Sequence, residues 1–179
     1  MVDWNLVVSV QAHGFRRAFE ALRGFGEVHK TDYYNVVTLH VPDPAAFPSL
    51  LQRAFEADPS LPSLLARVMP IERTFGFQNA EEFEHRACQV VADWLGRLHG
   101  HSFHVRMHRR GFKERIRSQH EEQFLDHWLL EQLSVRGQPG RITFEDPDYI
   151  IALETVGQRA GVSIWDRDER KRYPFLKLD

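Results

Sequence analysis

The order of hydrophobic patterns over the first 77 residues constrains the fold of this chain more than any other feature. Short apolar runs indicate strands, and apolar residues spaced three or four apart indicate helices. The patterns predict a strand at 5–10, a helix at 14–22, a hairpin of strands at 27–30 and 35–41, a helix from Pro44, and a strand at 68–75. This β-α-β-β-α-β order is that of the ferredoxin-like split βαβ arrangement.

Two local signals in this part of the chain give sharper predictions. Gly24 and Gly26 follow the first helix, and we expect them to end it in the left-handed conformation that glycine adopts readily. Pro70 lies within the last predicted strand. Because proline cannot donate to a sheet ladder, that strand is expected at a sheet edge or at a bulge.

The remaining residues show a second set of patterns. Two helices are predicted, and each begins with a capping-box pair, Asn79 with Glu82 and Ser118 with Glu121. An alternating strand at 102–108 lies between them, with an apolar face and a basic face. Three further strands are predicted at 141–144, 149–155 and 159–165. We therefore expect an α+β protein with domains at 1–77 and 78–179.

The charge of this protein is distributed unevenly. Residues 97–117 contain seven Lys or Arg and one acid, a net charge of +6 in a chain whose total is −2. The other residues therefore carry −8. A concentrated positive segment on an otherwise acidic protein favours a polyanion partner. The side chains expected to contact that partner are Arg106, His108, Arg109, Arg110, Phe112, Lys113, Arg115 and Arg117, with Arg159 and Lys177 as additional candidates.

Phe112 and the histidines of this segment allow two interpretations each. The ring of Phe112 either stacks on an unpaired base or packs beneath the loop. A metal site is the alternative function of His99, His101, His104 and His108. However, two strand residues four apart are about 13 Å apart by strand rise, too far for one ion. We expect no metal and no cofactor, and interpret the histidines as partly protonated groups beside phosphate.

A catalytic role is also possible for the carboxylates Asp146, Asp148 and Glu154. The Asp-Pro-Asp sequence is typical of a turn, because Pro147 fixes φ. Glu154 ends a buried strand, where we expect it to pair with an arginine such as Arg106 or Arg141. Structural roles are therefore favoured, and we expect that the chain is not an enzyme.

Composition restricts the class of protein. Cys88 is the single cysteine, which excludes an intramolecular disulfide and a cysteine-based zinc site. It lies on the apolar side of a predicted helix, so a packing role is expected. No apolar run approaches the roughly 20 residues of a membrane span, and the N-terminus lacks the pattern of a signal peptide. We expect a cytoplasmic protein without membrane contact.

The second half resembles the THUMP domain, an RNA-binding domain of tRNA-modifying proteins. The family pattern combines an "F-x-V-R" strand followed by "R-R", a helix, and a "(N/D)-P-D-x-x-I-x-x-E" strand. The matching segments are Ser102–Arg106 with Arg109 and Arg110, the helix start at 118–122, Phe144–Asp148, and Tyr149–Glu154 leading to Trp165. THUMP domains follow a ferredoxin-like domain, and the β-α-β-β-α-β region matches one. The resemblance thus implies a ferredoxin-like domain followed by a THUMP domain.

The resemblance also implies a function. It implies that the chain grips the acceptor stem and single-stranded 3′ end of tRNA. Because we expect no catalytic domain after Asp179, the nearest similarity is to stand-alone adaptors that help a separate acetyltransferase make N4-acetylcytidine. The ending Arg172–Lys177 resembles that subgroup. The alternatives are a protein-interaction adaptor that does not touch RNA, and an accessory subunit of a tRNA methylation or thiolation enzyme.

Overall fold

The computed structural model describes residues 3–178, and its contacts divide the chain into two compact units. The first unit extends to Glu72 and also contains Arg172–Lys177. The second unit contains Arg73–Lys171 and Leu178. The strand expected at 68–75 is in fact two strands, of which the second pairs within the second unit. For this reason the division lies after Glu72, five residues before the predicted boundary.

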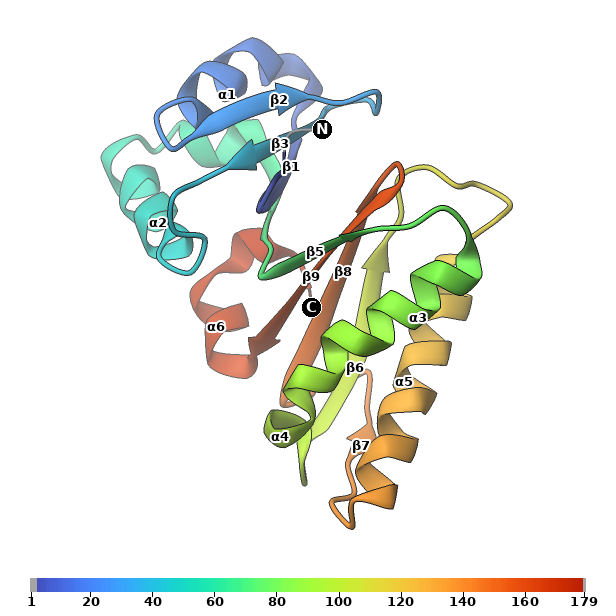
Figure 1. Cartoon of the computed structure of the whole chain (residues 1–179). Helices are drawn as coiled ribbons and strands as arrows, with labels where there is room; N and C mark the ends of the chain where they lie inside the picture. The colour runs from blue at the N-terminus through green and yellow to red at the C-terminus, as the bar shows by residue number, and fades with distance from the viewer. Residues whose placement is uncertain (1–2, 179) are drawn as a thin grey trace. The chain divides into compact units, whose positions relative to one another are not determined.

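The first unit consists of one sheet and its helices (Figure 1). Its elements are β1 (Leu6–Val10), α1 (Phe15–Leu22), β2 (Glu27–Lys30), β3 (Val36–His40), α2 (Phe47–Ala57) and β4 (Leu65–Pro70), with short 3-10 turns at Ala12–Gly14, Leu61–Leu64 and Pro174–Leu176. The strand order is β2-β3-β1-β4, and each neighbouring pair is antiparallel. This is the ferredoxin-like arrangement that the sequence predicts. β4 lies at the sheet edge, as Pro70 indicated.

Gly26 has a different role from the one expected. Positive φ angles occur at other glycines, so the predicted left-handed helix end at Gly24 and Gly26 is wrong. A Cβ atom added to Gly26 would lie 2.2 Å from the backbone oxygen of His40. The glycine is therefore required by the close approach of two backbone segments, not by an unusual φ.

The segment Arg172–Lys177 is hydrogen-bonded to the first unit. The guanidinium of Arg67 donates from Nε to the oxygen of Leu176 at 3.0 Å. The Ser49 hydroxyl lies 2.9 Å from that of Tyr173, and the Gln52 amide donates to the oxygen of Arg172. Lys177 thus belongs to the ferredoxin-like unit, to which the chain returns at Arg172, 100 residues after Glu72.

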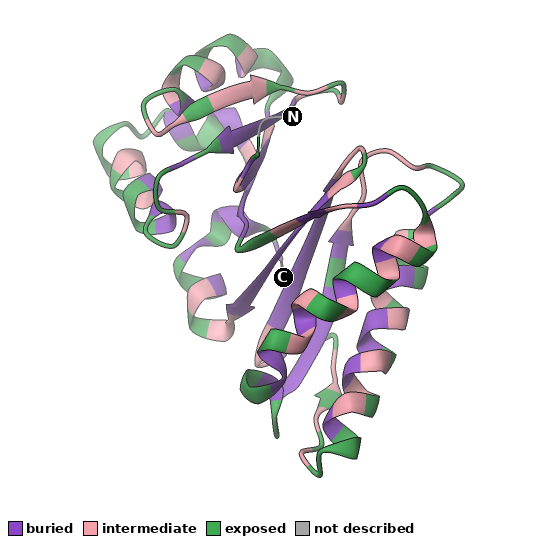
Figure 2. Ribbon diagram, in the orientation of Figure 1, coloured by how far each residue is buried: buried purple, intermediate pink, exposed green. Residues whose placement is uncertain are grey.

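The second unit is a five-stranded sheet whose two long helices lie on one face (Figure 1). Its elements are β5 (Arg73–Gly76), α3 (Ala80–Val91), a 3-10 turn at Ala92–Trp94, α4 (Leu95–Leu98), β6 (Ser102–His108), α5 (Ser118–Val135), β7 (Arg141–Ile142), β8 (Tyr149–Val156), β9 (Arg159–Asp166) and α6 (Arg167–Arg172). The strand order is β5-β9-β8-β6-β7, with β6 parallel to both of its neighbours. Figure 2 shows that the central strands are almost entirely buried.

The two predicted helix caps have opposite outcomes. At the start of α3, the Asn79 side chain accepts from the Glu82 amide at 2.8 Å, as predicted. At the start of α5, the N-cap residue is Arg117, and its side chain makes no capping bond. The predicted box of Ser118 with Glu121 is therefore wrong. Glu121 is instead buried, with 2% of its surface exposed.

None of the helices within residues 3–178 combines the length and the apolarity that a membrane crossing requires.

Candidate nucleic-acid interface

Strand β6 directs its basic residues away from the core. Its three apolar residues pack into the core with α3 and α5, and His104, Arg106 and His108 alternate with them on the opposite face. Arg106 is exposed, His108 is half-buried and His104 is buried. The basic face that the sequence predicts therefore exists, but only part of it is open to solvent.

The loop of residues 109–117 follows β6 and carries most of the predicted contacts. Its backbone is fastened to β8 and the turn after it, since the Arg110 amide donates to Thr155 Oγ1 and the Gly157 amide donates to the Arg110 oxygen, both at 2.9 Å. The Arg109 guanidinium donates within the loop to the Gly111 oxygen. Three cationic side chains of this loop are exposed: Lys113, Arg115 and Arg117.

Arg110 is bound to a buried acid. Its Nη1 lies 2.6 Å from Glu154 Oε2, and the Glu154 side chain has no exposed surface. His108 Nδ1 lies 3.9 Å from the same carboxylate. The sequence predicted an arginine partner for Glu154, but Arg106 and Arg141 were the wrong choices. Because β6 and β8 pair with His108 opposite Glu154, the partner comes from just beyond the end of β6.

Phe112 packs inside the second unit. Its ring centroid lies 5.1 Å from that of Phe77, and the side chain is half-buried against the core. The guanidinium of Arg115 lies over the same ring, 5.8 Å from its centroid. Of the two interpretations of Phe112, the geometry supports internal packing.

Two other predicted contacts are not part of the loop. The guanidinium of Arg159 donates to Thr74 Oγ1 at 2.7 Å, which joins β9 to β5. Lys177 is exposed and belongs to the first unit. Lys177 therefore lies in a different unit from the other nine predicted residues.

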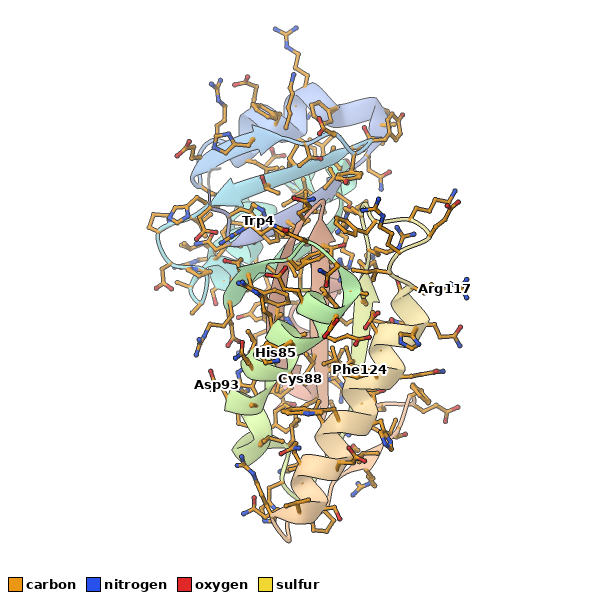
Figure 3. All side chains as sticks on the ribbon, turned by 45° about the vertical axis from the view of Figure 1, so that its right-hand side comes forward. Trp4, His85, Cys88, Asp93, Arg117 and Phe124 are labelled. Carbon is orange, nitrogen blue, oxygen red and sulfur yellow. The ribbon has the colours of Figure 1, made fainter. Side chains whose placement is uncertain are left out.

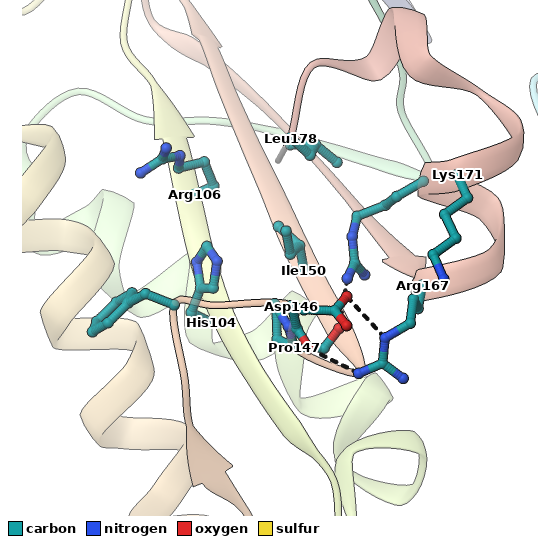
Figure 4. Close-up of a pocket in the computed structure, with 10 residues that line it drawn as sticks. His104, Arg106, Asp146, Pro147, Ile150, Arg167, Lys171 and Leu178 are labelled. Atoms are coloured by element: carbon teal, nitrogen blue, oxygen red, sulfur yellow. Dashed lines mark hydrogen bonds and ion pairs between the residues drawn. The ribbon is translucent and has the colours of Figure 1, made fainter.

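A cavity of about 320 Å³ lies beside β6 and α6 in the second unit (Figure 4). Four cationic residues and one acid line it, so its wall is net positive. The lining residues are His104, Arg106, Phe144, Asp146, Pro147, Ile150, Arg167, Arg170, Lys171 and Leu178. Among the described residues, Arg106 and Lys171 have no ion-pair partner. They are the cations of this cavity that remain available to a ligand.

Other cations of the cavity have structural partners. The Arg167 guanidinium donates to Asp146 Oδ1 at 2.9 Å, the contact drawn in Figure 4, and lies 3.2 Å from Asp148 Oδ1. Arg170 is buried and donates to the backbone oxygens of Trp165 and Pro147. These bonds join α6 to the turn before β8 and give the cavity a defined wall.

His104 and Phe144 form the part of the wall nearest β6. Burial lowers the pKa of His104 below its ordinary value, and the charges of Arg106 and Arg170 act in the same direction. This direction disfavours a protonated His104 in the free protein. The Phe144 ring lies 5.4 Å from that of His104 and is 73% exposed, so one of its faces is open to a planar group.

The Asp-Pro-Asp turn has the structural role that its sequence indicates. Asp148 Oδ2 accepts from the Ser102 amide at 2.9 Å, while the Asp148 amide donates to Ser102 Oγ, also at 2.9 Å. His101 Nδ1 lies 3.2 Å from the same carboxylate. The backbone bond from Ser102 is the main cause that lowers the pKa of Asp148 to about 2. This carboxylate thus fastens the turn to the start of β6.

The Asp148 bonds predict a dependence of stability on acid. Because its pKa is lowered in the folded protein, ionised Asp148 stabilises the fold above about pH 4, and this contribution is lost as the pH falls toward 2. Asp148→Asn keeps the acceptor oxygen but cannot titrate. We expect its free energy of unfolding to fall by about 1–2 kcal/mol less than that of the wild type over this range. Urea unfolding at a series of pH values measures this, with Glu145→Gln as the control. If the free energies of unfolding of Asp148→Asn and the wild type fell in parallel with pH, this role of Asp148 would be contradicted.

The structure also separates the histidines that suggested a metal. His101 contacts Asp148, His104 lies in the cavity wall, and His108 is near Glu154. Within residues 3–178, the side chains that could hold an ion together are Glu84, His120 and Glu121.

Sequence reasoning missed several cavity residues, among them Phe144, Arg167 and Lys171. Arg167 and Lys171 are four residues apart in a short basic segment, the spacing of one helix face. Phe144 directly precedes the predicted turn in a polar segment, which is a signal for an exposed ring.

The comparisons with known proteins concern the fold. No protein-family model matches the chain, and no curated protein matches its sequence. Among solved structures, PH1313 from Pyrococcus horikoshii Ot3 matches 90% of this chain and 55% of its own length, with a TM-score of 0.60 and 13% identity. The second unit has a THUMP-like fold. The first unit is ferredoxin-like.

Two further solved structures share this fold. A 4-thiouridine synthetase, solved as an RNA complex with bound ATP, matches 92% of this chain and 42% of its own length, with a TM-score of 0.53 and 12% identity. TrmN from Thermus thermophilus matches 90% of this chain and 45% of its own length, with a TM-score of 0.55 and 13% identity. This chain spans about half the length of these proteins.

Proposed function

We propose that this chain binds tRNA in the cytoplasm and presents it to a separate modifying enzyme. The observation that carries the proposal is the cavity in which Arg106, Lys171 and the open face of Phe144 come together. The exposed cations of the loop at 109–117 extend the positive surface. A THUMP-like fold shared with a synthetase that was solved with RNA supports the same proposal.

The cavity and the loop suit different parts of such a ligand. Arg106 and Lys171 attract phosphates, and each neutralised phosphate releases counterions. The Phe144 ring offers a stacking surface for an unpaired base, which single-stranded RNA provides and a duplex does not. We propose that the single-stranded 3′ end occupies the cavity, while Lys113, Arg115 and Arg117 contact the acceptor stem.

The proposal assigns catalysis to another protein. The carboxylates with the clearest catalytic potential, Asp148 and Glu154, are held by the Ser102 amide and by Arg110. Their contacts support structural roles. We propose an acetyltransferase that makes N4-acetylcytidine as the partner, on the strength of the sequence resemblance, with methylation and thiolation enzymes as alternatives. Assays of each enzyme class on tRNA, with and without this chain, distinguish these partners.

Binding of tRNA to two variants over a salt series tests the cavity. Arg106→Ala is expected to weaken binding about tenfold and to lower the slope of log affinity against log salt by about one, because one phosphate contact is lost. Phe144→Ala is expected to weaken binding by about fivefold or more without changing this slope, because stacking releases no counterion. Fluorescence anisotropy with labelled tRNA measures both effects.

The matched control is Arg136→Ala, which removes the same charge from an exposed position at the end of α5. Its affinity is expected to stay within about twofold of the wild type, since long-range charge effects are screened by salt. Equal losses in Arg106→Ala and Arg136→Ala would indicate nonspecific attraction. No salt-dependent binding by the wild type would instead favour the protein-interaction adaptor that does not touch RNA.

A further inference from the structure

A group of ligand-type side chains lies between α3 and α5, apart from the cationic cavity. One ligand atom each from Glu84 on α3 and from His120 and Glu121 on α5 lies within 4.8 Å of the other two. Figure 3 views this side of the second unit, where α3 and α5 lie next to each other, with Cys88 on α3 and Phe124 on α5 labelled.

Glu121 is the unusual member of this group. Its residue is 2% exposed, and its Oε2 atom is buried without a hydrogen-bond donor in the described part of the chain. A buried carboxylate oxygen without a donor costs free energy unless a proton or a cation satisfies it. The neighbouring side chain on α3 is Glu84, a second carboxylate, which supplies an acceptor and no fixed donor.

The distances within the group suit a small divalent cation. His120 Nε2 lies 3.5 Å from Glu84 Oε1. Ligand atoms about 2.0–2.2 Å from a tetrahedral zinc ion are separated by roughly 3.3–3.6 Å. His120 and Glu84 therefore already have the spacing of two neighbouring ligands. The ligand atom of Glu121 lies within 4.8 Å of both, so it needs only a small side-chain movement to coordinate the same ion.

The chemistry of the group also suits such an ion. Two carboxylates balance the charge of a divalent cation, and an imidazole is a preferred ligand of zinc and related first-row metals. Glu84 and Glu121 are shielded, whereas 66% of the His120 side chain is exposed. His120 can therefore adjust from the solvent side, and the fourth position of the ion is left for water.

We propose that Glu84, His120 and Glu121 bind one divalent first-row metal ion, with zinc as the probe, and that this ion joins α3 to α5. The alternative occupant of the group is a proton shared by the two carboxylates. Both occupants satisfy Glu121, but only the metal requires His120.

Zinc titration of the full chain, first stripped with a chelator, tests this proposal by calorimetry. We expect one ion per chain and a rise of the melting temperature with zinc, because a ligand that binds the folded state stabilises it. Glu121→Gln and His120→Ala are each expected to weaken zinc binding at least 30-fold and to abolish the rise. His120 is exposed, so its variant remains informative if Glu121→Gln fails to fold.

The chain offers a matched control on the same helix. His127 and Glu131 form an exposed pair with Nε2 and Oε1 3.2 Å apart, but no third ligand from residues 3–178 accompanies them. The double variant His127→Ala with Glu131→Gln is expected to keep the zinc affinity of the wild type. Absence of saturable binding, or equal losses in this control and in His120→Ala, would overturn the proposal. Retention of tRNA binding in the stripped protein keeps this result separate from the proposed RNA function.

Discussion

Arg110→Ala is expected to lower the free energy of unfolding by about 3–5 kcal/mol, the range for breaking a buried ion pair by removing one partner. The Arg110 side chain is 12% exposed, and Glu154 is fully buried 2.6 Å away. Truncation would leave a buried carboxylate without its guanidinium. Urea unfolding at neutral pH, followed by circular dichroism, measures the loss.

Two variants make this result specific. Lys113→Ala removes an exposed cation from the same loop and is expected to change stability by less than about 0.5 kcal/mol. The double variant Arg110→Ala with Glu154→Ala is expected to lose less than the sum of the two single variants, because both partners of one pair are gone. Additive losses would show that the two residues act independently.

This result changes how the RNA proposal has to be tested. Replacing the adjacent Arg109 and Arg110 together, as the basic sequence suggests, would combine lost charge with lost stability. A fall in tRNA affinity of that variant would then have two explanations. Arg106→Ala avoids this problem, because its side chain is exposed and lacks an ion-pair partner within residues 3–178.

Phe77→Ala is expected to destabilise the protein by about 3–5 kcal/mol, as large-to-small aromatic changes in a core do. Phe77 is 2% exposed, and its ring centroid lies 5.1 Å from those of both Phe83 and Phe112. The variant removes the surface on which the loop residue Phe112 rests. We therefore also expect faster amide hydrogen exchange in residues 109–117, measured by mass spectrometry.

Phe144→Ala is the matched control, since the same atoms are removed from a ring that is 73% exposed. Its stability is expected to change by less than about 0.5 kcal/mol. If Phe77→Ala unfolds the protein at ambient temperature, Phe77→Leu provides a milder change with the same expected direction. If amide exchange in residues 109–117 stayed slow in both Phe77 variants, the loop would not depend on the contact between Phe77 and Phe112.

The architecture was largely predictable from sequence because hydrophobic periodicity reports which face of each element is buried. The alternation in β6 predicted its two faces correctly, and the β-α-β-β-α-β order predicted the first sheet. The cap at Asn79 was predicted because an N-cap bond is local, spanning three residues. The same motif failed at Ser118, since burial against α3 determines the position of Glu121 and no local pattern reports it.

The candidate site was less predictable, because charge in a sequence does not show which cations are already paired. Arg110 lies three positions before Lys113 and Arg115 two positions after it, yet Arg110 is bound to a residue 44 positions later. The cavity depends on α6 approaching the turn before β8, which is a tertiary contact. The meeting of Phe144 and Lys171 in one cavity therefore became visible only in three dimensions.

The return of Arg172–Lys177 to the first unit has a consequence for folding. The second unit is, in topological terms, an insertion between two parts of the first. During synthesis, β4 emerges from the ribosome about a hundred residues before Leu176, whose oxygen Arg67 contacts. The ferredoxin-like unit is therefore completed last, although the strands of its sheet are synthesised first. The THUMP-like unit can fold while the β4 edge still lacks its contacts with Arg172–Lys177.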